Sequence, residues 1–222
     1  MRLLDLYCGA GGAATGYSQA GFTEIVGVDI EPQATYPFTF IQADAIGYLS
    51  WTRLKQFDLI HASPPCQHFT KYRNVVKDIT DRYEDLLQPT LDELRFVWEE
   101  FGVPSVVENV PGAPLHPDLV LCGSMFGLDV RRHRHFQLIG WDAMGPGGCN
   151  HKGWKRQFKS STDRTNLRYT IEVGAWDEPL ERQKQAMGVD WEITVRELSE
   201  AIPPAYTRFI GEQFASQFAA VS

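Results

Sequence analysis

The sequence lacks any uninterrupted apolar run of 18 or more residues, so it predicts no membrane-spanning helix. Its first residues, MRLLDLYCGAGG, break into glycines too early to form a secretory signal. Cysteine is scarce and carries no CxxC pair, since it occurs only at positions 8, 66, 122 and 149. This spacing argues against a disulfide framework and a structural zinc site. We therefore expect free thiols in a reducing cytoplasm, and no bound metal.

Basic residues are absent from one long stretch, because none lies between Arg2 and Arg53. They gather later: residues 131–168 hold nine Lys or Arg against two Asp, so the formal net charge of −7 divides into +7 there and −14 elsewhere. A basic segment on an acidic body predicts a face that binds nucleic acid. A solvated loop rich in Lys and Arg is the simpler alternative. The nucleic-acid contacts predicted on this face are Arg131, Lys152, Lys155 and Arg156.

The chain has room for one domain with a full core, because 43% of its 222 residues are hydrophobic. Apolar runs such as RLLDLY, EIVGVDI and FDLIHAS alternate with helical patterns, which predicts an α/β fold with a doubly wound, mostly parallel sheet. Helices are expected near 91–101, 194–200 and 205–218. We divide the chain into a core over 1–140, a short, loop-rich basic insertion over 141–185, and C-terminal helices over 186–222 that complete the core.

Several polar residues and thiols directly follow predicted strands, where parallel sheets bind their ligands. One crevice is expected to hold Cys8, Asp29, Asp44, Pro64, Cys66, Glu108 and Asn109. A buried helical face is predicted instead for apolar residues that recur at helical spacing, which are Leu91, Leu94, Val97, Trp98 and Phe101.

The segment DLYCGAGGAATG follows a predicted strand and opens a predicted helix. Its glycines at positions 9, 11 and 12 let a ligand approach the backbone closely. The pattern alone fits NAD, S-adenosylmethionine or a purely structural turn. Asp29 stands where an acid binds ribose hydroxyls, and Asp44 where one accepts from an adenine amino group. A cationic sulfonium needs no basic partner, so the lack of Lys and Arg here favours S-adenosylmethionine.

In SPPCQHF, residues 63–69, two prolines stiffen the backbone just before Cys66. A held thiol suits a nucleophile, and equally a rigid turn around a buried thiol. His68, His133 and His135 lack convincing metal-ligand spacing, and a structural role is the simpler reading of His135. Residues 67–83 predict an aromatic and basic lid over a base, formed by Phe69, Lys71, Tyr72, Arg73 and Lys77.

With DLYCGAGG, PPCQ and ENV in this order at successive strand ends, the chain resembles the C5-cytosine methyltransferase family. The likeness runs from Leu3 to about Gly211, and further matches are VDIEP, LCGSMFGL, RHR at 132–134, AMGVDW and AIPP. Three departures stand out. Val130 occupies a family glutamine position, Ser199-Glu200 replaces a Gly-Asn pair, and the recognition insertion over 141–185 spans only 45 residues.

The resemblance implies the Rossmann-like fold of class I S-adenosylmethionine-dependent methyltransferases, with S-adenosyl-L-homocysteine as coproduct. It implies that Cys66 attacks carbon 6 of cytosine while Glu108, its pKa raised by burial, protonates N3, so that carbon 5 can take the methyl group. Asn109 would fix Glu108, whereas Arg132 and Arg134 would favour the thiolate and orient the base. The implied cofactor residues are Tyr7, Cys8, Gly9, Ala10, Gly11, Gly12, Asp29, Ile30, Asp44, Ala45 and Pro64.

DNA is the implied partner, with the target cytosine flipped out or single-stranded. Gln67, Lys71 and Arg73 would contact it. Three alternatives stay open: the same chemistry on tRNA or a free cytidine nucleotide, a catalytically silent nucleic-acid-binding relative, and an NAD oxidoreductase, which explains neither PPCQ nor ENV. We expect a compact, monomeric cytoplasmic enzyme of the restriction-modification or phage kind, without membrane association.

Overall fold

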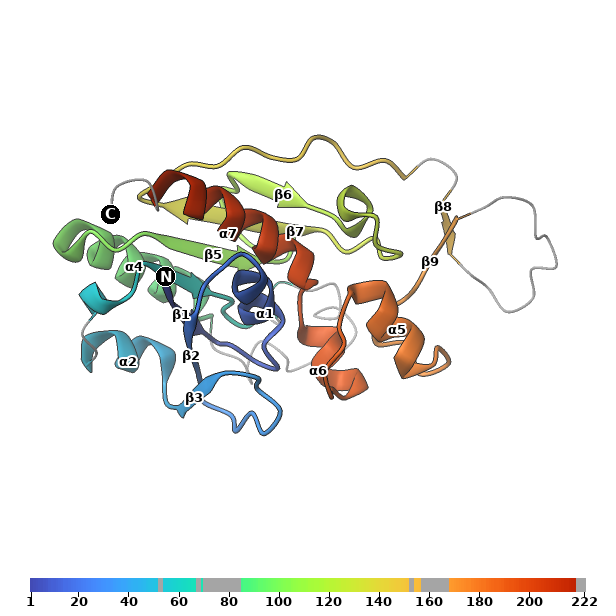
Figure 1. Cartoon of the computed structure of the whole chain (residues 1–222), viewed down its shortest axis with the longest axis horizontal. Coiled ribbons are helices and arrows are strands. Elements are labelled where there is room, and N and C mark those ends of the chain that lie inside the picture. Colours follow the sequence, from blue (N-terminus) through green and yellow to red (C-terminus); the bar gives the residue numbers. More distant parts are fainter. Residues whose placement is uncertain (52–53, 67–68, 70–84, 152–153, 157–167, 219–222) are drawn as a thin grey trace.

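A computed structural model describes residues 1–51, 54–66, 69, 85–151, 154–156 and 168–218 (Figure 1). Its centre is a seven-stranded sheet with the order β3-β2-β1-β4-β5-β7-β6. The strands are β1 (Arg2–Leu6), β2 (Glu24–Asp29), β3 (Thr39–Gln42), β4 (Leu59–Ala62), β5 (Ser105–Asn109), β6 (Leu119–Leu121) and β7 (Arg134–Ile139). A separate two-stranded sheet joins β8 (Trp154–Arg156) to β9 (Arg168–Thr170).

Strands β1 to β5 run parallel, and β7 is antiparallel to both its neighbours, β5 and β6. β4 and β5 are buried along their whole length, as is typical of parallel strands covered on both faces. The predicted mostly parallel α/β sheet is therefore confirmed. Because parallel strands end at one edge of a sheet, the loops that follow β1, β4 and β5 converge there.

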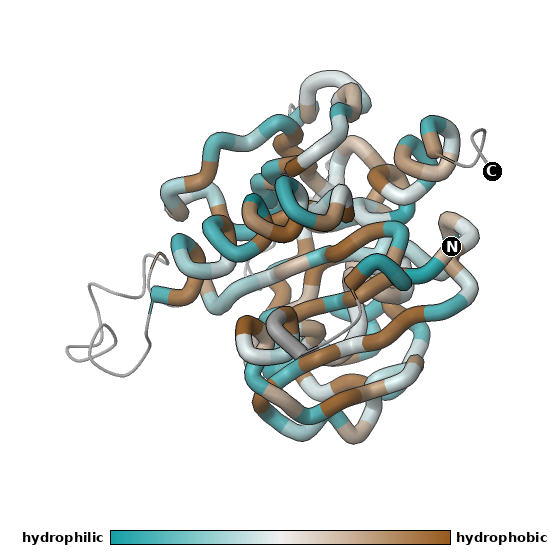
Figure 2. Tube along the Cα trace, turned by 90° about the vertical axis from the view of Figure 1, so that its left-hand side faces the viewer, coloured by the Kyte–Doolittle hydropathy of each residue, from teal (hydrophilic) through white to brown (hydrophobic). Residues whose placement is uncertain are grey.

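Helices cover both faces of the sheet. On one face, α1 (Gly12–Gln19) and α7 (Pro204–Phe218) lie side by side (Figure 1), while α2 (Ala45–Trp51) and α4 (Leu87–Phe101) pack on the other. Consecutive β1 residues serve the two faces, since Leu3 packs with Tyr17 and Tyr206 whereas Leu4 packs with Leu94. Figure 2 shows apolar stretches concentrated in the central strands. None of the helices described here is long and apolar enough to cross a membrane.

The contact between α1 and α7 depends on a glycine. A Cβ built at Gly16 would lie 2.0 Å from Thr207 Oγ1 and 2.1 Å from the carbonyl oxygen of Pro204. Thr207 Oγ1 in turn donates a hydrogen bond to Ala13 O at 2.8 Å. The absence of a side chain at position 16 thus lets the last helix lie directly on the first.

The C-terminal part adds a third apolar cluster. Met187 of α5 (Leu180–Met187) and Leu198 of α6 (Val195–Glu200) pack there with Ala10 and Val130. α6 begins with a capping box between Thr194 and Glu197. The predicted C-terminal helices are confirmed, but α5 begins inside the range 141–185, which is less irregular than predicted. The domain boundaries stay predictions. The part of the chain that the structure describes also includes the short 3₁₀ helices η1 (Leu54–Gln56) and η4 (Gly123–Phe126).

One prediction about α4 is wrong. Leu91, Leu94 and Val97 are buried as expected, but Trp98 and Phe101 are 37% and 41% exposed. Leu87 and Thr90 complete the buried stripe of the helix, so Trp98 and Phe101 fall beside it. The Trp98 ring instead covers Gly140, where a Cβ would lie 2.4 Å from its Cε3 atom. Helical spacing alone did not define the edge of the buried face.

Candidate active site

Cys66 closes the short proline segment that leaves β4, and its thiol is half-buried. The backbone of this segment is held from two sides. Cys66 O accepts a hydrogen bond from Phe69 N at 2.9 Å, and the Asn109 side chain donates to Pro64 O at 2.9 Å. Asn109 Oδ1 also accepts from Val110 N at 2.9 Å. The hydrogen bonds of Asn109 therefore position the Cys66 segment, rather than Glu108 as the sequence led us to expect.

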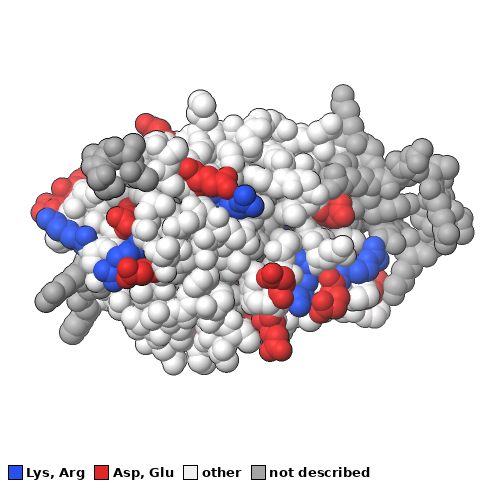
Figure 3. All heavy atoms as spheres, viewed as in Figure 1, with Lys and Arg blue, Asp and Glu red and all other residues white. Residues whose placement is uncertain are grey.

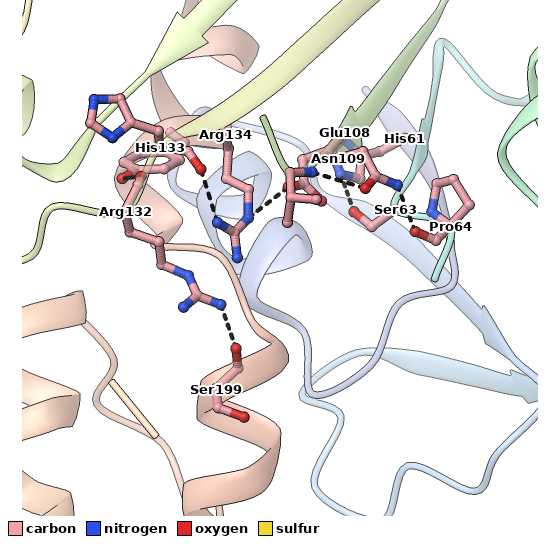
Figure 4. A network of polar contacts seen from close by, with 11 residues as sticks. His61, Ser63, Pro64, Glu108, Asn109, Arg132, His133, Arg134 and Ser199 are labelled. Carbon is pink, nitrogen blue, oxygen red and sulfur yellow. Dashed lines mark hydrogen bonds and ion pairs between the residues drawn. The ribbon is translucent and has the colours of Figure 1, made fainter. Parts of the chain in front are cut away.

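Glu108 lies near the end of β5 and forms an ion pair with Arg134, the first residue of β7. Glu108 Oε1 is 2.9 Å from Arg134 Nε, and the two side chains are only 8% and 11% exposed. Arg134 Nη1 also donates to the carbonyl oxygen of His133 at 2.9 Å. Ser63, in the Cys66 segment, hydrogen-bonds Glu108 (Figure 4). A buried carboxyl and a buried guanidinium thus meet at the sheet edge that carries Cys66.

Cys66 and Glu108 influence each other electrostatically, which places them in one polar site. Burial raises the pKa of Glu108, and Arg134 and Arg132 lower it only in part. This direction confirms the prediction drawn from its buried strand. Burial also raises the pKa of the Cys66 thiol, although Arg134 and Arg132 favour the thiolate. The arginines act as predicted on Cys66, but burial outweighs them in this structure.

The Arg132 side chain points toward Ser199 in α6, and not toward the Glu108–Arg134 ion pair. Its Nη2 donates to Ser199 O at 2.5 Å (Figure 4). The Arg132 carbonyl accepts from Tyr206 Oη at 2.5 Å. Burial, and to a smaller extent the nearby charge of Arg134, lowers the Arg132 pKa to about 9. The guanidinium therefore stays cationic at neutral pH. Ser199 is one of the departures from the family pattern, and it accepts the Arg132 hydrogen bond with its backbone carbonyl. That contact does not depend on which side chain stands at position 199.

A buried chain of hydrogen bonds, which the sequence did not predict, leads from the core to Glu108. Tyr17 Oη lies 3.1 Å from His61 Nδ1, and His61 Nε2 lies 3.0 Å from Ser63 Oγ. Ser63 then contacts Glu108. Burial lowers the His61 pKa to about 3, so the imidazole is neutral. The sequence signal was a histidine inside the apolar strand LIHA, where an unpaired polar group would be costly.

The glycine loop between β1 and α1 is built for close packing on one side and open space on the other. Gly9 and Gly11 have φ of 46° and 86°, in the region that favours glycine. A Cβ at Gly11 would lie 2.7 Å from Pro37 Cδ, and one at Gly12 would lie 2.6 Å from Ile202 O. A Cβ at Gly9 would meet nothing within 4 Å. The loop therefore leaves room for a ligand at Gly9.

The predicted acids lie at the same edge. Asp29, at the end of β2, accepts from Gly9 N and Glu31 N at 3.0 Å each, so it ties the glycine loop to β2. Ile30 beside it is 66% exposed, as a surface for a flat ring requires. Asp44 is exposed and accepts from Gly47 N at 2.6 Å, which caps α2. Ala45, also predicted to contact cofactor, is buried.

Other residues predicted to bind the cofactor are buried or make hydrogen bonds within the protein. Tyr7 has a φ of 56°, and its hydroxyl lies 2.8 Å from Thr90 Oγ1. Burial raises its pKa to about 12. Cys8 and Ala10 are buried, and Ala10 O accepts from Trp191 Nε1 at 3.0 Å. Trp191 lies in the matched segment AMGVDW, but its contact with the glycine loop was not predicted.

Most of the predicted nucleic-acid contacts cannot be placed. Gln67, Lys71, Arg73 and Lys152 lie outside the described residues, as does most of the predicted lid. Lys155 and Arg156 belong to β8 by their backbone alone. Arg131 is exposed, with Nη2 3.3 Å from His151 Nδ1. On the face drawn in Figure 3, Lys and Arg are mixed with Asp and Glu, so a basic face stays a prediction.

Residues 1–118 match a family model described as C-5 cytosine-specific DNA methylase. The type II methyltransferase M.AgeI of Thalassovita gelatinovora is 31% identical over 126 residues, which cover 50% of this chain and 28% of that protein. M.XorII of Xanthomonas oryzae pv. oryzae is 26% identical over 159 residues, covering 65% and 33% respectively. These matches span a third or less of each relative's own length.

Two solved structures share the whole fold. A protein encoded within an E. coli prophage and assigned as a DNA modification methyltransferase has a TM-score of 0.63 at 16% identity, covering 97% of this chain and 99% of that one. A Spodoptera frugiperda DNMT2 mutant has a TM-score of 0.60 at 15% identity, covering 96% and 99%. At these identities the likeness concerns the fold, which is that of class I S-adenosylmethionine-dependent methyltransferases.

The family model covers more than half of the chain, up to residue 118 of 222. Its range includes the glycine loop, the Cys66 segment and Glu108, which the structure brings to one edge of the sheet. The chain belongs to the C-5 cytosine-specific DNA methylase family.

Proposed function

We propose that this protein is a DNA (cytosine-5)-methyltransferase that acts on a flipped or single-stranded cytosine through a covalent bond to Cys66. The observation that carries the proposal is the shared site at the ends of β4 and β5. There a half-buried thiol, a buried carboxyl with a raised pKa and two guanidinium groups influence one another. This is the set of groups needed to attack one ring carbon while protonating the nearby ring nitrogen.

In the proposed reaction, the Cys66 thiolate adds to carbon 6 of cytosine, and protonated Glu108 gives its proton to N3. The Cys66 thiol gives its proton to water, and Arg134 and Arg132 stabilise the thiolate. Carbon 5 becomes nucleophilic and takes the methyl group that S-adenosylmethionine supplies. Loss of the carbon 5 proton to water then expels Cys66, and the N3 proton returns to Glu108. The expelled thiolate takes a proton back from water, so the net products are 5-methylcytosine, S-adenosyl-L-homocysteine and one proton released to solvent.

The glycine loop is the proposed site for S-adenosylmethionine. Open space at Gly9, the Asp29 carboxylate beside it and the exposed Ile30 side chain fit a ligand with a ribose and a flat base. The segment that carries Gly9, Asp29 and Ile30 holds no Lys or Arg, because none occurs between Arg2 and Arg53. A sulfonium cation suits such surroundings better than a pyrophosphate does.

DNA is the proposed substrate because the family is described by DNA methylation and the matched relatives are named type II methyltransferases. A methylation assay should compare duplex DNA, single-stranded DNA, RNA and dCMP under the same conditions. We expect transfer to DNA. Transfer to RNA or dCMP alone would reject the substrate while leaving the chemistry intact.

The mechanism is tested by incubating the protein with S-adenosylmethionine and DNA that contains 5-fluorocytosine. Fluorine at carbon 5 cannot leave as a proton does, so we expect a stable adduct that peptide mass spectrometry assigns to Cys66 and not to the other three cysteines. Cys66→Ser should form no adduct and transfer no methyl group, yet still bind S-adenosyl-L-homocysteine. An adduct on a different cysteine, or methylation by Cys66→Ser, would contradict the proposal.

A further inference from the structure

Four potential metal ligands converge outside the active site. The ligand atoms of Cys122, His133, Cys149 and His151 all lie within 4.8 Å of one another. Cys122 Sγ is 3.2 Å from His151 Nε2, and Cys149 Sγ is 3.4 Å from His133 Nε2. The two imidazole rings stand 5.1 Å apart at an interplanar angle of 80°. We propose that this Cys₂His₂ cluster binds a structural zinc ion.

The distances agree with tetrahedral zinc. With Zn–S near 2.3 Å and Zn–N near 2.0 Å, a sulfur and a nitrogen on one tetrahedron are about 3.5 Å apart. The observed sulfur–nitrogen distances of 3.2 and 3.4 Å are close to that edge. Two thiolates and two neutral imidazoles complete four-coordination and neutralise the charge of Zn²⁺. No position is left for water or substrate, which is typical of structural rather than catalytic zinc.

The surroundings of the cluster also suit a metal. Cys122 is fully buried, and Ser124 Oγ donates to its sulfur at 3.4 Å, as outer partners of a zinc thiolate do. On the other side, Arg131 Nη2 is 3.3 Å from His151 Nδ1. When zinc binds Nε2 of His151, the imidazole proton is on Nδ1, which can then no longer accept a hydrogen bond from Arg131. The exposed Arg131 side chain would therefore turn to solvent when the ion binds.

The sequence did not predict this site, because its ligands are separated by ten residues, then fifteen, then one. They come from three segments: the end of β6, the turn before β7 and the chain after Gly140. None of the common short ligand pairs of zinc motifs is present. The expectation that the chain carries no metal site was based on that spacing, and our proposal replaces it.

Zinc would secure one end of an irregular segment. Residues 141–151 form no helix or strand and include Gly-Pro-Gly-Gly at 145–148. The Gln213 side chain bonds both Met144 N and Met144 O, at 2.9 and 3.0 Å, and so holds the near end to α7. Cys149 and His151 hold the far end. The ion would thus fix the end of the segment at Cys149 and His151, as the α7 residue Gln213 fixes the end at Met144.

The same ion would steady the catalytic arginines. His133 lies between Arg132 and Arg134, and Figure 4 shows those two side chains pointing away from it toward Ser199 and Glu108. Fixing the His133 side chain restrains the backbone on both sides. The cluster is thus a positioning device for the Glu108 site, although it touches none of the reacting atoms.

Metal content gives the first test. The protein is expressed with zinc in the medium, and gel filtration removes loosely held metal. Inductively coupled plasma mass spectrometry should then find about one zinc per chain. Cys149→Ser and His151→Gln should lower this to near zero. His135→Gln, which removes a nearby histidine outside the cluster, should keep it. Equal zinc in the wild type and both ligand variants would overturn the proposal.

Two measurements on the unaltered protein keep the test decisive if those variants fold poorly. Co²⁺ in place of zinc should give the intense visible bands of a tetrahedral ion and thiolate charge-transfer absorption. Chelation should then speed alkylation of the half-buried Cys149 by at least about tenfold, since zinc holds it as a bound thiolate. An octahedral cobalt spectrum, unchanged alkylation, or a Cys122–Cys149 disulfide in the fresh protein would each reject the site. All these readouts are independent of methyl transfer.

Discussion

At the scale of single residues, the active-site carboxyl is tied to the core by neutral groups. Tyr17, His61 and Ser63 pass hydrogen bonds in sequence toward Glu108. His61 is completely buried, and its neutral form both accepts and donates a hydrogen bond through its two nitrogens. Burial disfavours a cation at this position, so the imidazole is neutral at neutral pH.

This state predicts a loss of stability in acid. The His61 pKa is about 3 when folded and about 6.5 when unfolded, so between these values the unfolded chain binds the extra proton. The His61 contribution to stability should be fully present above pH 6.5 and fall by about 1.4 kcal/mol per pH unit below it, or about 2 kcal/mol at pH 5. The raised pKa of Glu108 acts in the opposite direction, so the His61 share is obtained by comparing urea midpoints at pH 7 and pH 5 between the wild type and His61→Gln.

His61→Gln removes the titrating group and keeps a polar side chain. The variant should be less stable at pH 7, because its hydrogen bonds are imperfect, but should lose less stability between pH 7 and pH 5 than the wild type. Exposed His116→Gln serves as the control and should keep the full wild-type loss. If His61→Gln shows the same acid loss as the control, the buried imidazole is not its source.

At the scale of elements, the tightest junction is the one between the first helix and the last. Gly16 and Thr207 meet there without an intervening side chain, and Thr207 bonds the α1 backbone. α1 itself is an eight-residue helix without a side-chain cap, so packing rather than local sequence stabilises it. α7 therefore determines where α1, and with it the glycine loop, can lie.

Gly16→Ala should destabilise the protein by about 1–3 kcal/mol, because the added methyl meets both Thr207 Oγ1 and a backbone carbonyl. This loss opposes the gain of about 1 kcal/mol that alanine normally gives over glycine in a helix. Gln19→Ala, at an exposed position of α1, is the matched control and should change the urea midpoint little. A Gly16→Ala protein as stable as the wild type would show that α7 moves aside easily.

At the scale of the whole molecule, C-terminal segments support the N-terminal glycine loop. Trp191 Nε1 donates to Ala10 O, and the Ile202 carbonyl lies where a side chain at Gly12 would be. The matched sequences AMGVDW and AIPP thus pack against the glycine loop, the proposed cofactor site, although they are about 180 residues away along the chain. Segments from both ends of the sequence therefore meet at this loop.

Trp191→Phe tests that support. It removes the indole donor and keeps an aromatic ring, so it should weaken binding of S-adenosyl-L-homocysteine about fivefold, the effect of one hydrogen bond of about 1 kcal/mol. Isothermal titration calorimetry measures the affinity directly. Trp176→Phe changes a tryptophan that is 93% exposed and should leave the affinity as it is. Equal affinities of the two variants would argue against a role of Trp191 in holding the loop.

The parts of this molecule that were predicted correctly depend on order along the chain. Strand ends gave Cys66 and Glu108 a common edge, and the buried pattern around Glu108 gave the direction of its pKa. The partners of Asn109 and Arg132 were not predictable, because they depend on which backbone atoms of distant segments come within about 3 Å. The Tyr17 partner of His61 was not predictable either, because it depends on how α1 packs on β4. The same holds for the cysteine–histidine cluster, whose ligands meet only after β6 and β7 have paired.

The support of the glycine loop by Trp191 and α7 has a consequence for protein synthesis. β1 and α1 are translated well before Trp191, Ile202 and Thr207, which contact them. A growing polypeptide therefore lacks these contacts to the glycine loop until the three residues have been made. If the loop holds the methyl donor as proposed, a fragment that ends before Trp191 should bind S-adenosyl-L-homocysteine more weakly than the chain that includes it.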